Sequence, residues 1–300
     1  MMISEKILSE LERLHVNFCI DYELKNSCTF RVGGKCALAL FPCDESCLAL
    51  CVSLLDSYGV PLHIVGKGSN TLFFDGFIDK AFVFTSNVNQ INVSDTLLSC
   101  GAGVGLVSLA AKACDMGLEG LEFACGIPGS IGGAVFMNAG AHGGAMENIV
   151  VSTRAYNRKQ KRTVTITDNM FGYRDSIYKN NSDLVCLGAD ILLSRGEPQQ
   201  IRVKMRELLD QRKSKQPIEY PSAGSYFKRP EGDFAGRLIE TCGLKGMKMG
   251  GAEVSQKHAG FIINTGNATF NDIVTLERIV VDSVYEKTGV LLKREVEIVE

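Results

Sequence analysis

The spacing of hydrophobic and polar positions along the first 65 residues alternates between helical and extended patterns. Apolar residues three and four apart predict a short helix over residues 4–14. A strand is predicted near 36–41, followed by a helix that begins at Asp44 and reaches about residue 58. An apolar strand over 62–65 comes next, so this part of the chain predicts a small β-α-β unit.

Between residues 80 and 193 the pattern changes to several short extended segments around one helix. That helix is predicted over 104–116, with Gly117 as its C-terminal cap because a left-handed backbone is needed there. The short strands are typical of a mostly antiparallel sheet. A further amphipathic helix over 199–211 ends in a basic stretch before Pro217, which indicates a boundary.

The last hundred residues combine helices and strands without any repeat. We expect helices over 235–242 and from a cap at Asn271 to Gly289, and a strand over 260–265. A final strand is predicted over 290–299, where apolar and charged residues alternate with period 2. The sequence therefore predicts an α+β protein.

Composition narrows the class of protein. Hydrophobic residues make up 45% and charged residues 22%, as in globular domains. The net charge of -2 gives no general electrostatic reason to expect nucleic acid as a partner. No apolar run approaches the roughly 18 residues of a membrane span, and acidic residues interrupt the N-terminal segment, so we expect no membrane insertion and a cytoplasmic location. No oligomeric state is predicted.

The cysteines and histidines carry no motif of their own. The 11 cysteines include no CxxC pair, which argues against a disulfide framework and a structural zinc site. We expect Cys47, Cys51 and most of the others to be reduced thiols that fill the core. The 4 histidines show neither a metal pattern nor that of a hydrolase triad, so no metal site is predicted.

Glycine is unusually frequent, and the first cluster of glycines follows a strand. It comprises Gly66, Lys67, Gly68, Ser69 and Asn70. Such a loop can turn its backbone N–H groups toward an anion, although an ordinary tight turn is an alternative. The loop is neither a dinucleotide GxGxxG motif before a helix nor a Walker motif.

The second cluster, residues 117–144, holds nine glycines among apolar side chains. A flexible linker would be polar, so the backbone is expected to pass close to something. Gly126, Gly129, Gly132 and Gly133 would let the chain wrap a flat ligand, whereas the alternative is a glycine-rich packing corner. Two such loops about sixty residues apart indicate a dinucleotide.

Two further residues are candidates for chemistry. Ser225 stands on a predicted loop near Lys215 and Lys228, where a hydroxyl beside cations could donate a proton or contact a phosphate. Arg174 could bind a carboxylate or a developing oxyanion. Taken alone, an exposed serine and an ion pair of Arg174 with Asp175 are the more frequent interpretations.

Taken in order, these segments resemble the UDP-N-acetylenolpyruvoylglucosamine reductase family, whose members are also called UDP-N-acetylmuramate dehydrogenases. The resemblance covers nearly the whole chain. It is carried by NSCTFRVGG at 26–34, VGKGSN at 65–70, the glycine cluster at 117–144, YRDS at 173–176, PSAGSYFKRPEGDFAGRLIE at 221–240, GGAEVSQKHAGFIINTGNAT at 250–269 and REVEIV at 294–299.

The resemblance implies a two-subdomain FAD-binding fold of the vanillyl-alcohol-oxidase type plus a smaller α+β substrate-binding domain. The implied parts are residues 1–80, 81–197 and 198–300. Arg174, Ser225 and Glu295 are the implied catalytic residues. Lys215, Gln216 and Lys228 are the implied contacts of the nucleotide sugar. The implied FAD contacts are Gly66, Lys67, Gly68, Ser69, Asn70, Gly126, Ile127, Pro128, Gly129, Ser130, Gly132, Gly133, Asn138 and Gly140.

The family chemistry is the reduction of UDP-N-acetylglucosamine enolpyruvate by NADPH through FAD, in the synthesis of peptidoglycan precursors. It implies a hydride from flavin N5 to C3 and a proton from Ser225 to C2, with Arg174 and Glu295 stabilising the carboxylate-centred charge. A flavin oxidase of the same fold and an inert nucleotide-sugar binding module are the alternatives. The set of Arg174, Ser225 and Glu295 argues against the oxidase.

The sequence departs from the family pattern at a few places. His142 stands where many members have tyrosine, and Cys125 precedes GIPG. After YRDSIYK there is no room for a long tyrosine-bearing insertion, so the chain resembles the shorter subclass. No histidine lies in the loop 66–74, which favours noncovalent FAD. The preference for NADPH follows from the resemblance alone.

Overall fold

The computed structural model describes residues 4–300, so the first three residues of the predicted N-terminal part lie outside it. The chain forms two compact units. The first unit comprises the described residues up to Tyr22 together with Cys36–Lys67 and Asp79–Gln211. The second comprises Glu23–Lys35, Gly68–Ile78 and Arg212–Glu300. The finer predicted bounds at residues 80 and 197 stay a prediction.

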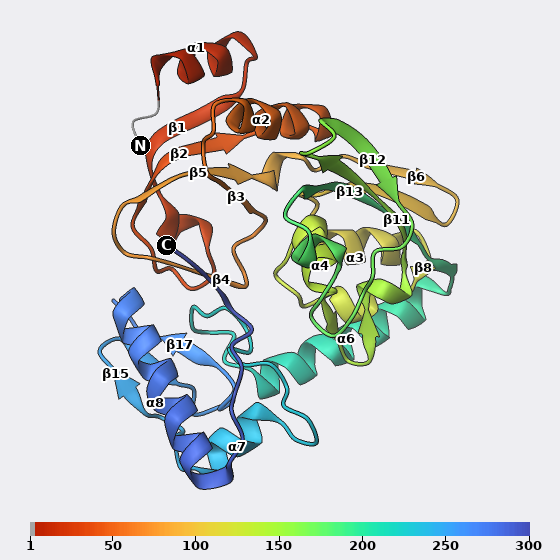
Figure 1. Cartoon of the computed structure of the whole chain (residues 1–300). Coiled ribbons are helices and arrows are strands. Elements are labelled where there is room, and N and C mark those ends of the chain that lie inside the picture. Colours follow the sequence, from red (N-terminus) through yellow and green to blue (C-terminus); the bar gives the residue numbers. More distant parts are fainter. Residues whose placement is uncertain (1–3) are drawn as a thin grey trace. The chain divides into compact units, whose positions relative to one another are not determined.

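The N-terminal part of the first unit is a four-stranded sheet with strand order β1-β2-β5-β3, in which β3 and β5 are parallel. Helix α2 packs its apolar side on this sheet (Figure 1). The Asp44 side chain accepts a hydrogen bond from the backbone N–H of Cys47 and so caps α2 as predicted. The elements are α1 (Glu5–Arg13), β1 (Asn17–Glu23), β2 (Lys35–Phe41), α2 (Glu45–Ser57), β3 (Leu62–Val65), β5 (Ile78–Phe84) and the 3-10 turn η2 (Thr85–Asn87).

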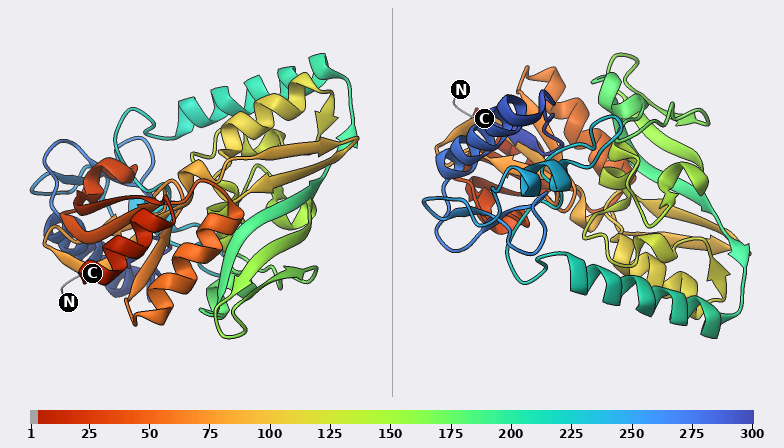
Figure 2. Two further views of the ribbon diagram at one scale, coloured as in Figure 1. Left: turned by 90° about the horizontal axis from the view of Figure 1, so that it is seen from above. Right: turned by 90° about the horizontal axis from the view of Figure 1, so that it is seen from below.

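The rest of the first unit is a five-stranded antiparallel sheet with order β12-β11-β13-β7-β6. Helices α3 and α4 pack on one face of it (Figure 1). Helix α6 lies along α3 in both views of Figure 2, and its Met205 and Leu208 pack against the same core. Gly117 ends α3 with φ +66°, as predicted.

The elements of this part are β6 (Ile91–Ser94), β7 (Leu97–Gly101), α3 (Leu106–Asp115), β8 (Leu118–Glu119), η3 (Glu122–Ala124), α4 (Ile131–Met137), β9 (Gly140–Ala141), β10 (Gly144–Ala145), η4 (Met146–Asn148), β11 (Val150–Asn157), β12 (Arg162–Ile166), α5 (Ile177–Asn180), β13 (Leu184–Leu192), β14 (Ser194–Arg195) and α6 (Pro198–Lys215).

Two arginines, Arg154 in β11 and Arg158 directly after it, hold α2 at both ends. Arg154 donates to both carboxylate oxygens of Glu45 near the start of α2, at 2.7–3.1 Å. Arg158 makes the equivalent paired contact with Asp56 near the end of the helix. Because the paired geometry of guanidinium and carboxylate fixes orientation, the two contacts keep α2 in register with β11.

The second unit contains a three-stranded antiparallel sheet, β15-β16-β17, with α8 packed beside it (Figure 1). A separate pair joins β4 and β18 in parallel. The elements are η1 (Leu24–Ser27), β4 (Thr71–Phe73), α7 (Ala235–Thr241), β15 (Lys248–Met249), β16 (Ala252–Val254), β17 (Ile262–Asn264), α8 (Phe270–Thr288) and β18 (Glu297–Val299).

Three expectations are wrong in detail. Helix α8 is capped by Thr269 rather than Asn271, because the Thr269 hydroxyl accepts from the N–H of Asp272. The final strand covers only Glu297–Val299, since the preceding residues pair with another segment instead of a sheet. The glycine cluster at 117–144 is not loop throughout but contains α4.

The cysteines divide by burial. Within residues 4–300 all 11 are free thiols, and most are buried, as expected of side chains that fill the core. Cys51 is buried and Cys47 half-buried, whereas Cys19 and Cys43 are exposed. In the same residues, no helix combines the length and the apolar character that a membrane crossing needs.

Candidate functional site

The two glycine clusters meet within the first unit. A Cβ at Gly66 would overlap the Oγ of Ser130, so only glycine permits this approach. The second cluster is fixed by backbone bonds to residues 102–106: the N–H of Ile131 donates to Val104 O at 2.8 Å, and that of Gly132 to Ala102 O at 2.8 Å. The structure thus brings together loops that are about sixty residues apart in the sequence.

The hydroxyl of Ser130 marks this place as a binding site. Ser130 is 1% exposed, and its Oγ has no hydrogen-bond partner among the described residues. Burying a hydroxyl without a partner costs about 1–3 kcal/mol, so an orphaned one calls for an explanation. A ligand with acceptor oxygens would provide the missing partner. Gly66 and Gly133 leave the backbone beside Ser130 uncovered by side chains.

Asn138 and Gly140, implied as FAD contacts, both make hydrogen bonds with other parts of the protein. The Nδ2 of Asn138 donates to Gly172 O at 2.9 Å, and its Oδ1 accepts from the N–H of Glu147 at 3.0 Å. The carbonyl of Gly140 accepts from Nη2 of Arg174 at 3.1 Å. Both residues therefore contact the segment that carries Arg174.

Arg174 is half-buried in the first unit and has a left-handed backbone, with φ +55°. Its guanidinium lies over the ring of Tyr173, with 5.4 Å from Cζ to the ring centroid. Asp175, the expected ion-pair partner, accepts from the side chain of Asn180 and from the N–H of Ser176. The carboxylate of Asp175 thus serves to order the turn.

The remainder of the first glycine loop belongs to the second unit. Gly68 has φ +58°, and a Cβ there would overlap the carbonyl of Ser27. The Nδ2 of Asn70 donates to Glu295 O at 3.2 Å, and the N–H of Glu297 donates to Asn70 O at 2.9 Å. Asn70 therefore fixes the backbone on both sides of residue 296.

The structure places Ser225 and Glu295 on paired segments of the second unit. The N–H of Glu295 donates to Tyr226 O at 2.8 Å, and Phe227 and Arg294 form an antiparallel bridge. Ser225 is exposed and Glu295 is half-buried. Ser225 and Glu295 are about seventy positions apart in the sequence. The pairing of their segments holds the two residues near each other in the second unit.

Tyr226 anchors the extended segment that presents Ser225. It is fully buried, and its hydroxyl donates to Oε2 of Glu277 at 2.9 Å. Arg294 Nη1 lies 3.1 Å from the same carboxylate oxygen. Burial, together with the negative charge of Glu277, raises the pKa of Tyr226. The hydroxyl therefore stays protonated and remains a donor to Glu277.

A second contact to Tyr226 runs through its backbone. The N–H of Tyr226 donates to Gly260 O at 2.8 Å, and the N–H of Gly260 donates to Nδ1 of His258 at 3.1 Å. Burial lowers the pKa of His258, with a smaller contribution from the charge of Lys245. Sequence reasoning missed Glu277 and His258 because no local pattern connects either residue with Ser225. Tyr226, in contrast, lies inside the GSYFK motif.

The three implied nucleotide-sugar contacts lie in two places. Lys215 and Gln216 stand at the end of α6, where the N–H of Gln216 donates to Arg212 O at 2.8 Å. Lys228 follows in the segment of Ser225, and its N–H donates to Lys293 O at 2.8 Å. Their role in binding stays a prediction.

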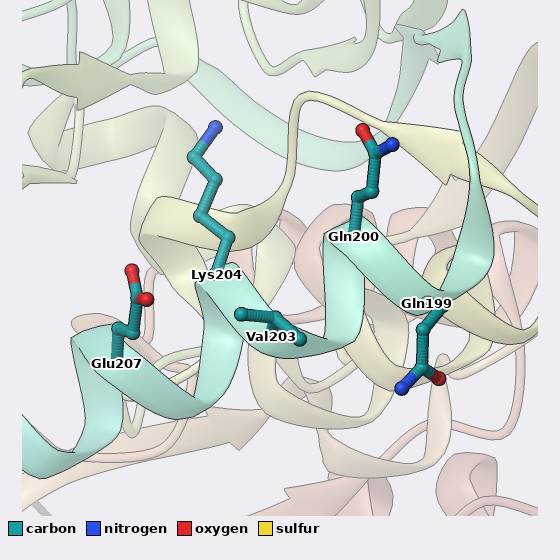
Figure 3. A pocket seen from close by; sticks show the side chains of 5 residues that line it. All are labelled: Gln199, Gln200, Val203, Lys204 and Glu207. Atoms are coloured by element: carbon teal, nitrogen blue, oxygen red, sulfur yellow. The ribbon is translucent and has the colours of Figure 1, made fainter.

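A shallow pocket of about 370 Å³ lies on α6 and contains none of the implied site residues (Figure 3). One helix supplies its whole lining, namely Gln199, Gln200, Val203, Lys204 and Glu207. Lys204 pairs with the buried carboxylate of Glu122 at 3.3 Å. Among residues 4–300, no group of three or more His, Cys, Asp or Glu side chains is arranged to hold a metal ion.

Comparison with known proteins shows which family the chain belongs to. Residues 216–299 match the family model of the C-terminal domain of UDP-N-acetylenolpyruvoylglucosamine reductase, and residues 36–165 match that of an FAD binding domain. UDP-N-acetylenolpyruvoylglucosamine reductase 2 of Bacillus anthracis is 40% identical over 280 residues, which cover 93% of this chain and 92% of the relative. The chain belongs to the UDP-N-acetylenolpyruvoylglucosamine reductase family.

Further members of this family show the same relation. The reductase of Clostridium perfringens (strain SM101 / Type A) is 42% identical over 281 residues, with 93% of this chain and 92% of the relative covered. The crystal structure of the family member from Thermus caldophilus superposes with a TM-score of 0.80 at 30% identity, covering 95% of this chain and 99% of that one. The resemblance seen in the sequence is confirmed.

The flavoenzyme fold extends beyond this family. Phl p 4.0202, a glucose dehydrogenase, matches 65% of this chain and 45% of its own at 14% identity with a TM-score of 0.51, which shows a shared fold. The predicted fold class, an FAD-binding fold of the vanillyl-alcohol-oxidase type with an additional α+β domain, is confirmed. FAD is the cofactor, and it fits the orphaned Ser130 hydroxyl and the bare backbone around Gly66.

Proposed function

We propose that this protein reduces UDP-N-acetylglucosamine enolpyruvate to UDP-N-acetylmuramate, with noncovalent FAD as cofactor and NADPH as hydride donor. The observation that carries the proposal is that the residues directly after Ser225 pair with Arg294 and Glu295, inside the region that matches the family's C-terminal domain. Such a reaction belongs to the synthesis of peptidoglycan precursors, and a cytoplasmic location stays a prediction.

FAD, when bound, supplies a hydride to C3 of the enolpyruvyl group after reduction by NADPH. The residues of the first unit that would hold its phosphates are those around the two glycine clusters. The Ser130 hydroxyl would donate to a phosphate oxygen, and the bare backbone at Gly66 and Gly133 lets a bulky anion approach closely. Ser69, which follows Gly68 in the loop, would add a hydroxyl donor.

Each catalytic residue has a role that follows from its chemistry. Hydride addition at C3 leaves negative charge at C2, which is delocalised onto the substrate carboxylate. The guanidinium of Arg174 would stabilise that charge by paired hydrogen bonds. The Ser225 hydroxyl would protonate C2, and Glu295 in its protonated form would donate a hydrogen bond to the same charge-bearing group. An ordinary serine is a weak acid, so this proton transfer requires a strongly basic carbon.

The implied sugar contacts suit the rest of the substrate. Lys215 and Lys228 would bring positive charge to the diphosphate, and Gln216 would add an amide. An oxidase of the same fold would need neither a proton donor at the position of Ser225 nor an arginine at the position of Arg174 to bind a substrate carboxylate.

The test is a pair of separate half-reactions. The purified protein should be yellow, should lose its flavin absorbance with NADPH in the absence of oxygen, and should regain it when UDP-N-acetylglucosamine enolpyruvate is added. A colourless protein that takes up no FAD would contradict both flavoenzyme functions. Bleaching that oxygen reverses and the enolpyruvyl substrate does not would favour the oxidase.

Ser225→Ala tests the proton donor. We expect bleaching by NADPH at the normal rate and loss of about 10²–10⁴-fold in reoxidation by the enolpyruvyl substrate. Ser222→Ala, in the same loop, is the matched control, because the contacts of Ser222 with Thr29 use its backbone. Equal losses in both half-reactions of Ser225→Ala would contradict the assigned role.

A further inference from the structure

Arg174 lies at the tip of a loop, residues 169–178, which we call the Arg174 loop. Its two ends are joined by Thr153 of β11, which is fully buried. The Thr153 hydroxyl donates to Oδ1 of Asn169 at 2.7 Å and lies 2.6 Å from the hydroxyl of Tyr178. The base of the loop is therefore fixed, whereas the position of its tip depends on other contacts.

The tip is tied to the C-terminal end of α4. Three bonds connect them: Asn138 Nδ2 donates to Gly172 O at 2.9 Å, the Ser176 hydroxyl donates to Phe136 O at 2.8 Å, and Arg174 Nη2 donates to Gly140 O at 3.1 Å. The first of these brings a side chain of α4's end to the loop backbone two residues before Arg174, and on the other side Nζ of Lys179 donates to Arg174 O at 3.2 Å.

Both the backbone and the side chain of Asn138 suit its hydrogen bond to Gly172. It is 3% exposed and ends α4 in a left-handed conformation with φ +41°, which points the chain into the next hairpin. Its Oδ1 accepts from the N–H of Glu147 at 3.0 Å, so both ends of the amide are used by the protein. Asparagine is the non-glycine residue that most readily combines such a backbone with a donor and an acceptor.

We propose that Asn138 is a positioning residue for Arg174 and not a contact of FAD. The inference rests on the proposed function, in which Arg174 binds the substrate carboxylate. Arg174 itself has a left-handed backbone, which costs a residue with a side chain about 1–2 kcal/mol and persists only under external restraint. Without the bond from Asn138, the loop can relax and move the guanidinium away from its working position.

Asn138→Gly is the principal test, since glycine adopts φ +41° without strain and removes only the side chain. We expect the FAD dissociation constant and the rate of bleaching by NADPH to stay within about two-fold of wild type. Reoxidation by UDP-N-acetylglucosamine enolpyruvate should fall about 10- to 100-fold, because misplacement of about 1 Å has costs of that size. Asn148→Ala is the matched control, as exposed Asn148 accepts from Ala145 N within the neighbouring hairpin.

A second variant keeps the test decisive if glycine loosens the fold. Asn138→Asp keeps the acceptor for Glu147 N but places a carboxylate oxygen against Gly172 O, so it should lose reoxidation while still binding FAD. Weaker FAD binding with full reoxidation at saturating FAD would overturn the inference. So would full reoxidation in both variants.

A double-mutant cycle separates positioning from general destabilisation. If Asn138 acts through Arg174, Asn138→Gly should reduce reoxidation no further in an Arg174→Ala background. Multiplicative losses would overturn the inference. A wild-type protein that never reoxidises with the enolpyruvyl substrate would instead contradict the proposed function, and the two failures are thus distinguishable.

Discussion

The Arg174 loop in the first unit and the segment of Ser225 in the second present their residues by different chemistry. The base of the Arg174 loop and its ties to α4 use mainly uncharged amides and hydroxyls, those of Asn138, Ser176 and Thr153, although charged groups of Arg174, Asp175 and Lys179 also bond within this region. The segment of Ser225 depends on a carboxylate and a guanidinium at Tyr226, and on an imidazole that accepts from Gly260.

This difference in bonding groups predicts how each region responds to pH and to charge-changing substitutions. Neutral donors and acceptors keep their hydrogen bonds across the accessible pH range. The half-buried carboxylate of Glu277 contributes only while its partners are present, and the half-buried imidazole of His258 accepts from Gly260 only while it is unprotonated. We therefore expect the second unit to be the more sensitive to charge-changing substitutions and to acid.

The largest effect on stability is expected for Glu277→Ala. It removes the acceptor of the fully buried Tyr226 hydroxyl and the partner of Arg294, at a cost of about 2–3 kcal/mol in the free energy of unfolding. Denaturant unfolding measures it. Glu286→Ala, at an exposed position of α8, is the control and should cost less than about 0.5 kcal/mol. Equal losses for the two variants would show that the charged cluster does not brace Tyr226.

A smaller effect is expected for Thr153→Val in the first unit. The change keeps the shape of the side chain and removes the hydroxyl shared by Asn169 and Tyr178, at about 1–2 kcal/mol. Because no ionisation is involved near neutrality, the loss should be the same at pH 5 and pH 8. The exposed Thr163→Val on β12 serves as control. If the stability loss of Thr153→Val changed with pH, the two regions would not differ in their sensitivity to pH.

The smallest effect concerns His258. Its pKa is lowered in the folded protein, so the unfolded chain binds the proton first. Stability should therefore fall as the pH drops below the ordinary histidine pKa of about 6.5, with the loss continuing toward pH 5. His258→Phe keeps a ring against Phe261 and should flatten this dependence. If the variant follows the same slope as wild type, His258 is not the titrating group.

Much of the fold could be predicted because local signals agreed with it. The Asp44 cap and the Gly117 stop mark helices α2 and α3 correctly, since capping is a local property of the backbone. The cap of α8 was misplaced by two residues because Thr269 and Asn271 are both good caps. Helix α4 was missed because Gly132 and Gly133 disfavour a helix that tertiary bonds stabilise.

The candidate site divides in the same way. The glycine clusters stood out by their residue types and spacing, whereas Arg174, Ser225 and Glu295 were implied as catalytic residues by the resemblance to the family. The residues that hold the site residues in place could not be predicted from the sequence. Glu277 bonds the Tyr226 hydroxyl, and His258 accepts from Gly260, whose carbonyl bonds the Tyr226 backbone. These contacts form only in the folded chain, and no local sequence pattern predicts them.

The sequence by itself determined the family and the flavin-binding fold, since both rest on local patterns and their order, and through the family resemblance it implied the residues that would carry the chemistry. Only the tertiary structure shows which protein groups the side chains of Asn70 and Asn138 reach. Both residues stand in glycine-rich motifs that imply cofactor contacts, and in the folded chain their side chains donate to the backbone at Glu295 and Gly172. A side-chain amide offers the same groups to a ligand and to a carbonyl, and only the folded chain determines which one lies within reach.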